Sequence, residues 1–281
     1  WQEGHTAHAD EADAREETMW ALENYRSFAE DLLALPVIAG AKPENERFPG
    51  AVDTYSIEAM MQDGKALQAG TSHYLGTHFA EAQNIRFQDK EGGMSFAHTT
   101  SWGISTRLIG GVLLPPGADD GLRTPPAVAP YQVVIVPMLR GKPEDADLLK
   151  YCETLAAEIG AHSAFGARVR VFIDRKDAKP ADKRWDWVRR GAPIVCEIGP
   201  RDAANGKVSY LRRDKLREGE KVAIQTVDRA EFIGAVEKIL PEIQNILFSE
   251  AKARLDANIR GDFKSLVDVA AYYGADDEEG A

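Results

Sequence analysis

The sequence predicts two folded units joined by a proline-rich segment: an α+β unit first, then an α/β unit with a mixed sheet. Polar and apolar residues alternate over 67–76, which is typical of a strand. Six of the fourteen prolines fall between 115 and 137, where the chain is expected to be extended. Beyond them, apolar strands alternate with helices of 3.6-residue periodicity, as in an α/β layer.

The first unit is expected to begin with a strand and a long helix. Asp10 should cap this helix, Leu32 should lie on its apolar face, and Pro36 should end it. Further on, a turn is expected at 101–103, after which Arg107 opens a short apolar helix. Strands are predicted over 1–8, 68–76, 85–88 and 96–100, a strand or short helix over 54–61, and a helix near 77–83.

The second unit should contain a buried sheet covered by helices. Strands are predicted over 132–137, 168–173, 194–198 and 208–211, and helices over 148–160 and 181–190. Asp228 should cap a last helix that runs through Leu240, and after Pro241 the chain is expected to remain helical to about Leu255. We place the units at 1–124 and 125–240, followed by a C-terminal extension, 241–281, whose acidic tail is expected to be disordered.

Composition limits the class of partner. The formal net charge is −11, which argues against broad, non-specific affinity for nucleic acid. No apolar run reaches the length of a membrane span, so no membrane partner is expected. Cys152 and Cys196 are predicted to be buried thiols of a reducing compartment, which favours the cytoplasm. The chain opens on Trp1 and not on a methionine, as expected for part of a longer protein.

Two stretches carry most of the predicted chemistry. The strand over 67–76 presents Gln68, Thr71 and His73, although an ordinary satisfied histidine would fit equally well. Arg107 follows small residues, an arrangement typical of a phosphate clamp; the alternative is a salt bridge to an interior carboxylate. His5 and His8 form only a weak metal motif, because no cysteine or further histidine lies near them.

Four stretches together resemble the prolyl-tRNA synthetases. Trp-Gln-Glu-Gly-His-Thr-Ala-His at 1–8 resembles the second strand of motif 2, and 67–76 resembles the strand that contacts proline and ATP. Residues 101–107 resemble motif 3, and 129–137 resembles the entry to the anticodon-binding domain. The resemblance implies the C-terminal part of a class II antiparallel catalytic sheet, followed by an α/β anticodon-binding domain.

Little chain separates the motif 2 strand from the strand that begins near Gln68, which leaves no room for an editing insertion. The chain therefore resembles the form typical of eukaryotes and archaea, which often ends in a zinc-binding domain. Motif 1 and the first strand of motif 2 are expected outside this sequence. We accordingly expect the chain alone to hold an incomplete active site and to contain no zinc site.

The activity implied by the resemblance is that of a proline–tRNA ligase. Such an enzyme uses ATP, with Mg²⁺, to convert proline into prolyl adenylate, then transfers it to tRNA(Pro), and the full-length protein is expected to be a homodimer. Two alternatives remain: a non-catalytic RNA-binding paralogue, and a sister class II synthetase for threonine, serine or glycine.

The resemblance also implies residue roles. On the ATP side these are Gln68, Thr71 and the catalytic Arg107. Around proline they are Trp1, Glu3, Phe48, His73, Ser101, Trp102 and Gly103. For the tRNA anticodon they are Lys183, Arg184, Trp187, Arg189, Arg190, Arg201 and Arg212. Val188, Ala127, Asp53 and Pro49 depart from the family pattern near these sites.

Overall fold

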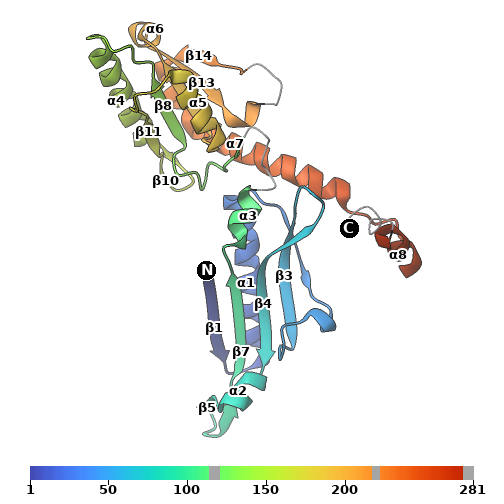
Figure 1. Cartoon of the computed structure of the whole chain (residues 1–281). Helices are drawn as coiled ribbons and strands as arrows, with labels where there is room; N and C mark the ends of the chain where they lie inside the picture. The colour runs from blue at the N-terminus through green and yellow to red at the C-terminus, as the bar shows by residue number, and fades with distance from the viewer. Residues whose placement is uncertain (114–120, 217–221, 275–281) are drawn as a thin grey trace.

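A computed structural model of the chain describes residues 1–113, 121–216 and 222–274. It contains two units, each with a β-sheet, which are linked through one long helix, α7 (Arg229–Asn258) (Figure 1). The expected disordered tail and the start of the proline-rich segment lie outside the described residues. Within the described ranges, no helix combines the length and apolarity needed to cross a bilayer.

The first unit is an antiparallel five-stranded sheet in the order β1-β7-β4-β3-β2. Its strands are β1 (Gln2–His8), β2 (Val37–Ala41), β3 (Asp53–Met60), β4 (Ala66–Gly76) and β7 (His98–Ile104). A separate hairpin is formed by β5 (Arg86–Gln88) and β6 (Met94–Phe96). The helical elements are α1 (Glu11–Ser27), the π-helix η1 (Phe28–Leu32), the 3₁₀ turn η2 (Glu44–Glu46), α2 (His78–Gln83) and α3 (Arg107–Leu113). The antiparallel sheet predicted from the sequence is confirmed.

Helix α1 covers one face of this sheet (Figure 1). The side chain of Asp10 caps it by accepting the backbone N–H of Asp13 at 3.0 Å. The hydroxyl of Ser72 on β4 donates to the carbonyl of Thr18 on α1 at 2.7 Å. Since side chains alternate along a strand, the residues on either side of Ser72 must face away from α1. Thr71 and His73 therefore lie on the open face.

Two expectations for this unit need correction. Residues 101–103 do not form a turn, because β7 continues to Ile104 in register with β1, and the Trp102 ring lies over Gly4. A Cβ on Gly4 would lie 2.5 Å from that ring, so only glycine fits there. Leu32 is 38% exposed and not core. The helix widens into a π turn, with the Leu33 N–H donating to the Phe28 carbonyl, and this changes which side chains face the sheet.

The second unit is a mixed sheet in the order β11-β8-β12-β13-β14, as predicted. The strands β11 (Val171–Ile173), β8 (Val133–Pro137) and β12 (Ile194–Ile198) are parallel, and β13 (Lys207–Arg212) and β14 (Gln225–Asp228) are antiparallel. A small hairpin comprises β9 (Ser163–Ala164) and β10 (Ala167–Arg168). The helices are α4 (Asp145–Ala161), α5 (Pro180–Arg189), α6 (Pro200–Ala204), the 3₁₀ turn η3 (Arg213–Lys215), α7 and α8 (Leu266–Gly274).

Helix α7 differs from the expectation in its cap and in its relation to the expected unit boundary. Asp228 occupies the N-cap position, but its carboxylate pairs with Lys207 at 2.8 Å and forms no side-chain cap. The helical structure expected beyond Pro241 is confirmed, and it forms one helix with the preceding residues, from Arg229 to Asn258. The expected boundary at 240/241 therefore falls inside one continuous helix. The C-terminal half of α7 leaves the second unit and passes beside the first (Figure 1).

Gln244 on α7 connects the two units. Its amide nitrogen donates to the carbonyls of Asp31 and Leu32 at 3.0 and 3.1 Å, and its amide oxygen accepts the N–H of Ala127 at 3.2 Å. The side chain is 5% exposed, so these backbone groups have little access to water as a replacement partner. One glutamine thus holds the end of η1, the linker and α7 together.

Replacing Gln244 with leucine should destabilise the protein by about 2 kcal/mol, because three backbone groups lose a partner while the buried volume is kept. Urea unfolding measures the change. The matched control is Asn245→Ala, one residue further along α7 and exposed, which should leave the midpoint unchanged. Equal midpoints for the two variants would show that Gln244 contributes nothing to the contact.

Candidate active site

A cavity of about 350 Å³ opens on the face of the first sheet that α1 does not cover. Its walls come from β1, β4, β7, the start of α3 and the loop before β3. All ten residues assigned to ATP or proline from the sequence line it: Trp1, Glu3, Phe48, Gln68, Thr71, His73, Ser101, Trp102, Gly103 and Arg107. Sheet pairing brings together residues up to 102 positions apart in the chain, as in the pair Gln2 and Ile104.

The floor of the cavity consists of two rows of residues that run across the strands. In one row Glu3, Gly103 and Thr71 are cross-strand partners. In the other, Ser101 lies between His5 and His73. Gly103 and Ser101 occupy the middle of each row, so the centre of the floor carries almost no side chain. Larger groups stand at the edges, and a small molecule would fit between them.

Arg107 lies at the end of the cavity where α3 begins. Its guanidinium donates to the backbone carbonyl of Gln68 at 3.2 Å. Across the described parts of the chain, no carboxylate lies within ion-pair distance of it, so the interior salt bridge considered from the sequence is not formed. An unneutralised guanidinium at a cavity wall is suited to bind an anion.

Trp1 and Glu3 form the β1 wall. The indole N–H of Trp1 donates to the Glu3 carboxylate at 3.0 Å, and Trp1 is 89% exposed. The carboxylate is the acidic group on this wall of the cavity. It could pair with a ligand cation next to an aromatic surface.

Phe48 and His73 form the opposite wall. Their ring centroids are 5.0 Å apart, and Phe48 also stacks on Phe79 at 6.4 Å. The backbone N–H of Phe48 donates to the hydroxyl of Thr54 at 3.0 Å, and the same hydroxyl is 3.0 Å from His73 Nδ1. The loop and the histidine are therefore held by one group on β3. Thr54 was not anticipated from the sequence.

Burial keeps His73 neutral. It lowers the pKa of the imidazole from 6.5 to about 4, and the charge of Lys42 acts in the same direction. His73 is 9% exposed, so solvent screening is small. Its ring is thus uncharged at neutral pH and can donate one hydrogen bond and accept another.

His73 should make the protein less stable as the pH falls. Because the folded state binds the proton less tightly than the unfolded state, stability is lost between pH 6.5 and about 4. Between about pH 7.5 and pH 5 the loss should be about 2 kcal/mol. Urea unfolding at both pH values should show this loss in the natural protein and a smaller one in His73→Asn. Parallel profiles would contradict the lowered pKa.

Two residues that border the cavity, Trp102, which was assigned to proline, and Gly70, face mainly the core. The Trp102 ring packs over Gly4 on the α1 side, although Trp102 also borders the cavity. Gly70 likewise serves the core, because a Cβ there would lie 2.9 Å from Ile104 and 3.2 Å from Tyr25. The small residues of 67–76 thus allow α1 to approach the sheet.

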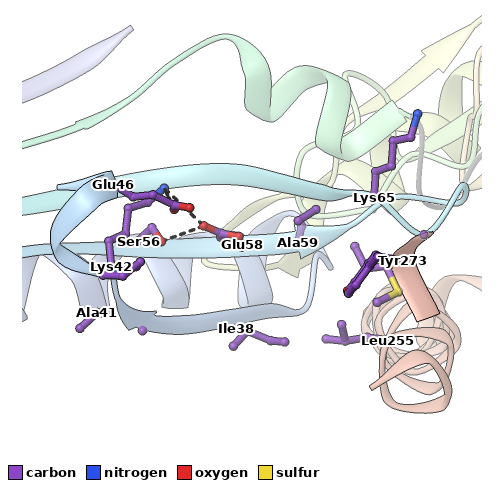
Figure 2. Close-up of a pocket in the computed structure, with 15 residues that line it drawn as sticks. Ile38, Ala41, Lys42, Glu46, Ser56, Glu58, Ala59, Lys65, Leu255 and Tyr273 are labelled. Carbon is purple, nitrogen blue, oxygen red and sulfur yellow. Dashed lines mark hydrogen bonds and ion pairs between the residues drawn. The ribbon is translucent and has the colours of Figure 1, made fainter. Parts of the chain in front are cut away.

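A second cavity, of about 580 Å³, lies beside the β2–β3 edge and is bordered by Leu255 and Tyr273 (Figure 2). Figure 2 shows Lys42 next to Glu46 and Glu58, with nitrogen–oxygen distances of 3.8 and 3.7 Å. Ser56 donates to Glu58 at 3.0 Å. These polar groups satisfy one another, and none of the residues assigned to ATP or proline lines this cavity.

In the second unit, three of the residues assigned to the anticodon are buried in the fold. Lys183 is 4% exposed and donates to the carbonyls of Asp174 and Lys176. Trp187 donates to the Asp174 carboxylate at 2.8 Å. Arg212 is 9% exposed and forms a two-pronged pair with a buried aspartate. Their positions indicate a structural role, since nucleic-acid contact requires accessible groups.

The remaining four lie near opposite ends of the strands of the second sheet. Arg184 pairs with Glu197 near the carboxyl end of β12, and Arg201 follows that strand on α6. Arg189 and Arg190 lie at the other end of α5, next to the linker. Lys179, an exposed residue just before α5, adds a positive charge at the same end of the strands as Arg184 and Arg201. It was not predicted, because the sequence does not indicate which lysines lie close together in space.

Comparison with known proteins gives consistent matches. The family described as "Anticodon binding domain" matches residues 132–239. Proline–tRNA ligase of Sphingopyxis alaskensis is 60% identical over 278 residues, 99% of this chain and 52% of the relative. That of Erythrobacter litoralis is 58% identical over 275 residues, 97% of this chain and 54% of the relative. The chain thus spans about half the length of the curated relatives it matches.

A solved structure is also similar. It is the prolyl-tRNA synthetase from Cryptosporidium parvum complexed with L-proline and AMP, with a TM-score of 0.83 and 36% sequence identity. The match covers 92% of this chain and 51% of that chain. Both halves of the fold predicted from the sequence are therefore those of a class II synthetase.

Proposed function

The chain belongs to the prolyl-tRNA synthetases, and from this premise we propose that the protein it represents is a proline–tRNA ligase. The observation that carries the proposal is the composition of the open-face cavity. An unneutralised guanidinium, Arg107, stands at one end, and the Glu3 carboxylate, His73 and an aromatic wall surround the rest. These groups fit a nucleotide phosphate and a small cyclic imino acid.

The proposed reaction has two steps. A carboxylate oxygen of proline attacks the α-phosphorus of ATP, an oxygen–phosphorus bond forms, and pyrophosphate leaves. A ribose hydroxyl at the tRNA 3′ end then attacks the prolyl carbonyl carbon, and AMP leaves. The first step requires neutralised phosphates and well-positioned reactants more than proton transfer.

Each part of the cavity has a proposed role in this scheme. Arg107 binds phosphate oxygens, and Gln68 and Thr71 contact the adenosine side. The Glu3 carboxylate pairs with the protonated imino nitrogen of proline, and Phe48 and Trp1 enclose the proline ring. Ser101 and Gly103 leave space for the ring on the floor, which the cross-strand rows support.

For tRNA(Pro), we propose contact through the exposed basic residues of the second unit. Arg201 is the best candidate, because it is exposed and forms no ion pair within the described ranges. Arg189 and Arg190, at the opposite end of the strands, are the next candidates. Exposed guanidinium groups can meet both phosphates and unstacked bases.

We further propose that Mg²⁺ accompanies ATP, that the full-length protein is a homodimer and that it works in the cytoplasm. Magnesium is usually held by substrate phosphates and one or two carboxylates. Within the described residues, no three His, Cys, Asp or Glu side chains gather as a metal site. The proposal therefore assigns no residue of this chain to the ion.

Amino-acid-dependent exchange between ATP and labelled pyrophosphate, on the full-length protein, tests the activity. Exchange should occur with proline and not with threonine, serine or glycine. Exchange with another of these amino acids would indicate a sister synthetase. No exchange with any of them, together with tRNA binding, would indicate the non-catalytic paralogue.

A further inference from the structure

We propose that Thr54 is a positioning residue: its hydroxyl fixes His73 as the tautomer that carries its proton on Nε2, so that the ring donates a hydrogen bond into the proline cavity. The inference deepens the proposed function and rests on it. Thr54 is outside the residues that line the cavity, and it acts through two residues that do line it.

The argument begins with the hydrogen bond from Phe48. A backbone N–H can only donate, so the Thr54 oxygen must accept it, at 3.0 Å. The hydroxyl has one proton of its own. Thr54 is 2% exposed, and a buried hydroxyl proton without an acceptor costs free energy.

His73 Nδ1, 3.0 Å from the hydroxyl oxygen, provides that acceptor. Among the described residues, Thr54 has no other side-chain hydrogen-bond partner. If Nδ1 carried the proton instead, the hydroxyl would accept two bonds and its own proton would be left unsatisfied. With Nδ1 as acceptor, the Phe48 N–H, the Thr54 hydroxyl and Nδ1 all have a hydrogen-bond partner. The single proton of the neutral ring is therefore on Nε2.

The Nε2 atom lies on the side of the ring away from Thr54, where His73 borders the cavity with Thr71 and Ser101. A ring N–H there can donate to a carboxylate or carbonyl oxygen of the bound ligand. The same hydroxyl also fixes the Phe48 backbone, and the Phe48 ring lies 5.0 Å from His73. One buried group thus sets the position of a polar and an apolar wall.

The test compares Thr54→Val with Thr54→Ser in the full-length protein, by pyrophosphate exchange as a function of proline concentration. Valine keeps the shape and removes the hydroxyl, whereas serine keeps the hydroxyl. We expect the KM for proline to rise about tenfold in Thr54→Val with a smaller change in kcat, and Thr54→Ser to restore it. Thr18→Val is the matched control, since Thr18 is also buried and hydrogen-bonded but lies on α1.

A double-mutant cycle separates positioning from general loosening of the fold. In a His73→Asn background, Thr54→Val should raise KM clearly less than it does in the natural protein, because only its action through the Phe48 backbone remains. Additive effects, or an unchanged KM in Thr54→Val, would overturn the proposal. If the natural protein shows no proline-dependent exchange, the proposed function fails instead, so the two failures are distinguishable.

The ring itself gives an independent readout. Selective ¹⁵N labelling of histidine should show His73 as a single neutral tautomer with the proton on Nε2 in the natural protein and in Thr54→Ser. In Thr54→Val the proton should redistribute between the two nitrogens. A proton on Nδ1 in the natural protein would overturn the proposal even if Thr54→Val lowers activity.

Discussion

Replacing Arg107 with alanine in the full-length protein is expected to slow proline-dependent pyrophosphate exchange about a hundredfold, which corresponds to roughly 3 kcal/mol of transition-state stabilisation. The guanidinium faces the cavity without a carboxylate partner, so its charge is available for the phosphates of ATP. Charge moves from the α-phosphorus towards the leaving pyrophosphate during the reaction, and a fixed cation stabilises that shift. The loss should therefore affect kcat more than the KM for proline.

Two further variants make this result interpretable. Arg107→Lys keeps the charge but loses the planar fork, so an intermediate rate is expected. Arg86→Ala removes an exposed arginine of the same unit that does not line the cavity, and it should leave exchange unchanged. Because Arg107 also donates to the Gln68 carbonyl, thermal unfolding of each variant checks that the sheet remains intact. An unchanged exchange rate in Arg107→Ala would exclude the proposed role.

The sequence predicted much of the fold because the relevant signals are local. Alternation over 67–76 depends on neighbouring residues, and so does the cap formed by Asp10, and the structure contains both the strand and the cap. The prediction of a turn at 101–103 was wrong for the opposite reason. Those residues continue a strand because β1 pairs with them and Trp102 packs over Gly4, and such long-range contacts leave no local signal.

The same distinction applies to the candidate site. Residues that resemble the family motifs line one cavity, whereas Thr54 and Lys42, which act on His73 from outside the cavity, were not anticipated. Their influence depends on the pairing of β2 with β3 and of β3 with β4, and a single sequence does not specify those registers. A lysine or arginine within a helix is equally ambiguous. Lys183 looks like a basic surface residue in the sequence, yet its amine is buried against two backbone carbonyls.

Arg212 provides the sharpest test of that ambiguity, because it was assigned to tRNA and the structure buries it. Its guanidinium donates to both carboxylate oxygens of Asp214, at 3.0 and 2.8 Å, and to Glu242 on α7 at 2.9 Å. Asp214 is 1% exposed. Arg212→Met should therefore destabilise the second unit by about 3–5 kcal/mol, since a buried carboxylate loses its two-pronged partner.

The matched comparison is Arg201→Ala, which removes an exposed arginine of the same unit. Urea unfolding and tRNA(Pro) binding at several salt concentrations separate the two roles. Arg201→Ala should keep the unfolding midpoint and weaken tRNA binding with a shallower salt dependence. Arg212→Met should lose stability and tRNA binding together, because the surface that contacts tRNA is no longer held in place. If Arg212→Met instead kept the midpoint and lost only tRNA binding, the arginine would contact the nucleic acid directly and the buried pair would have no structural role.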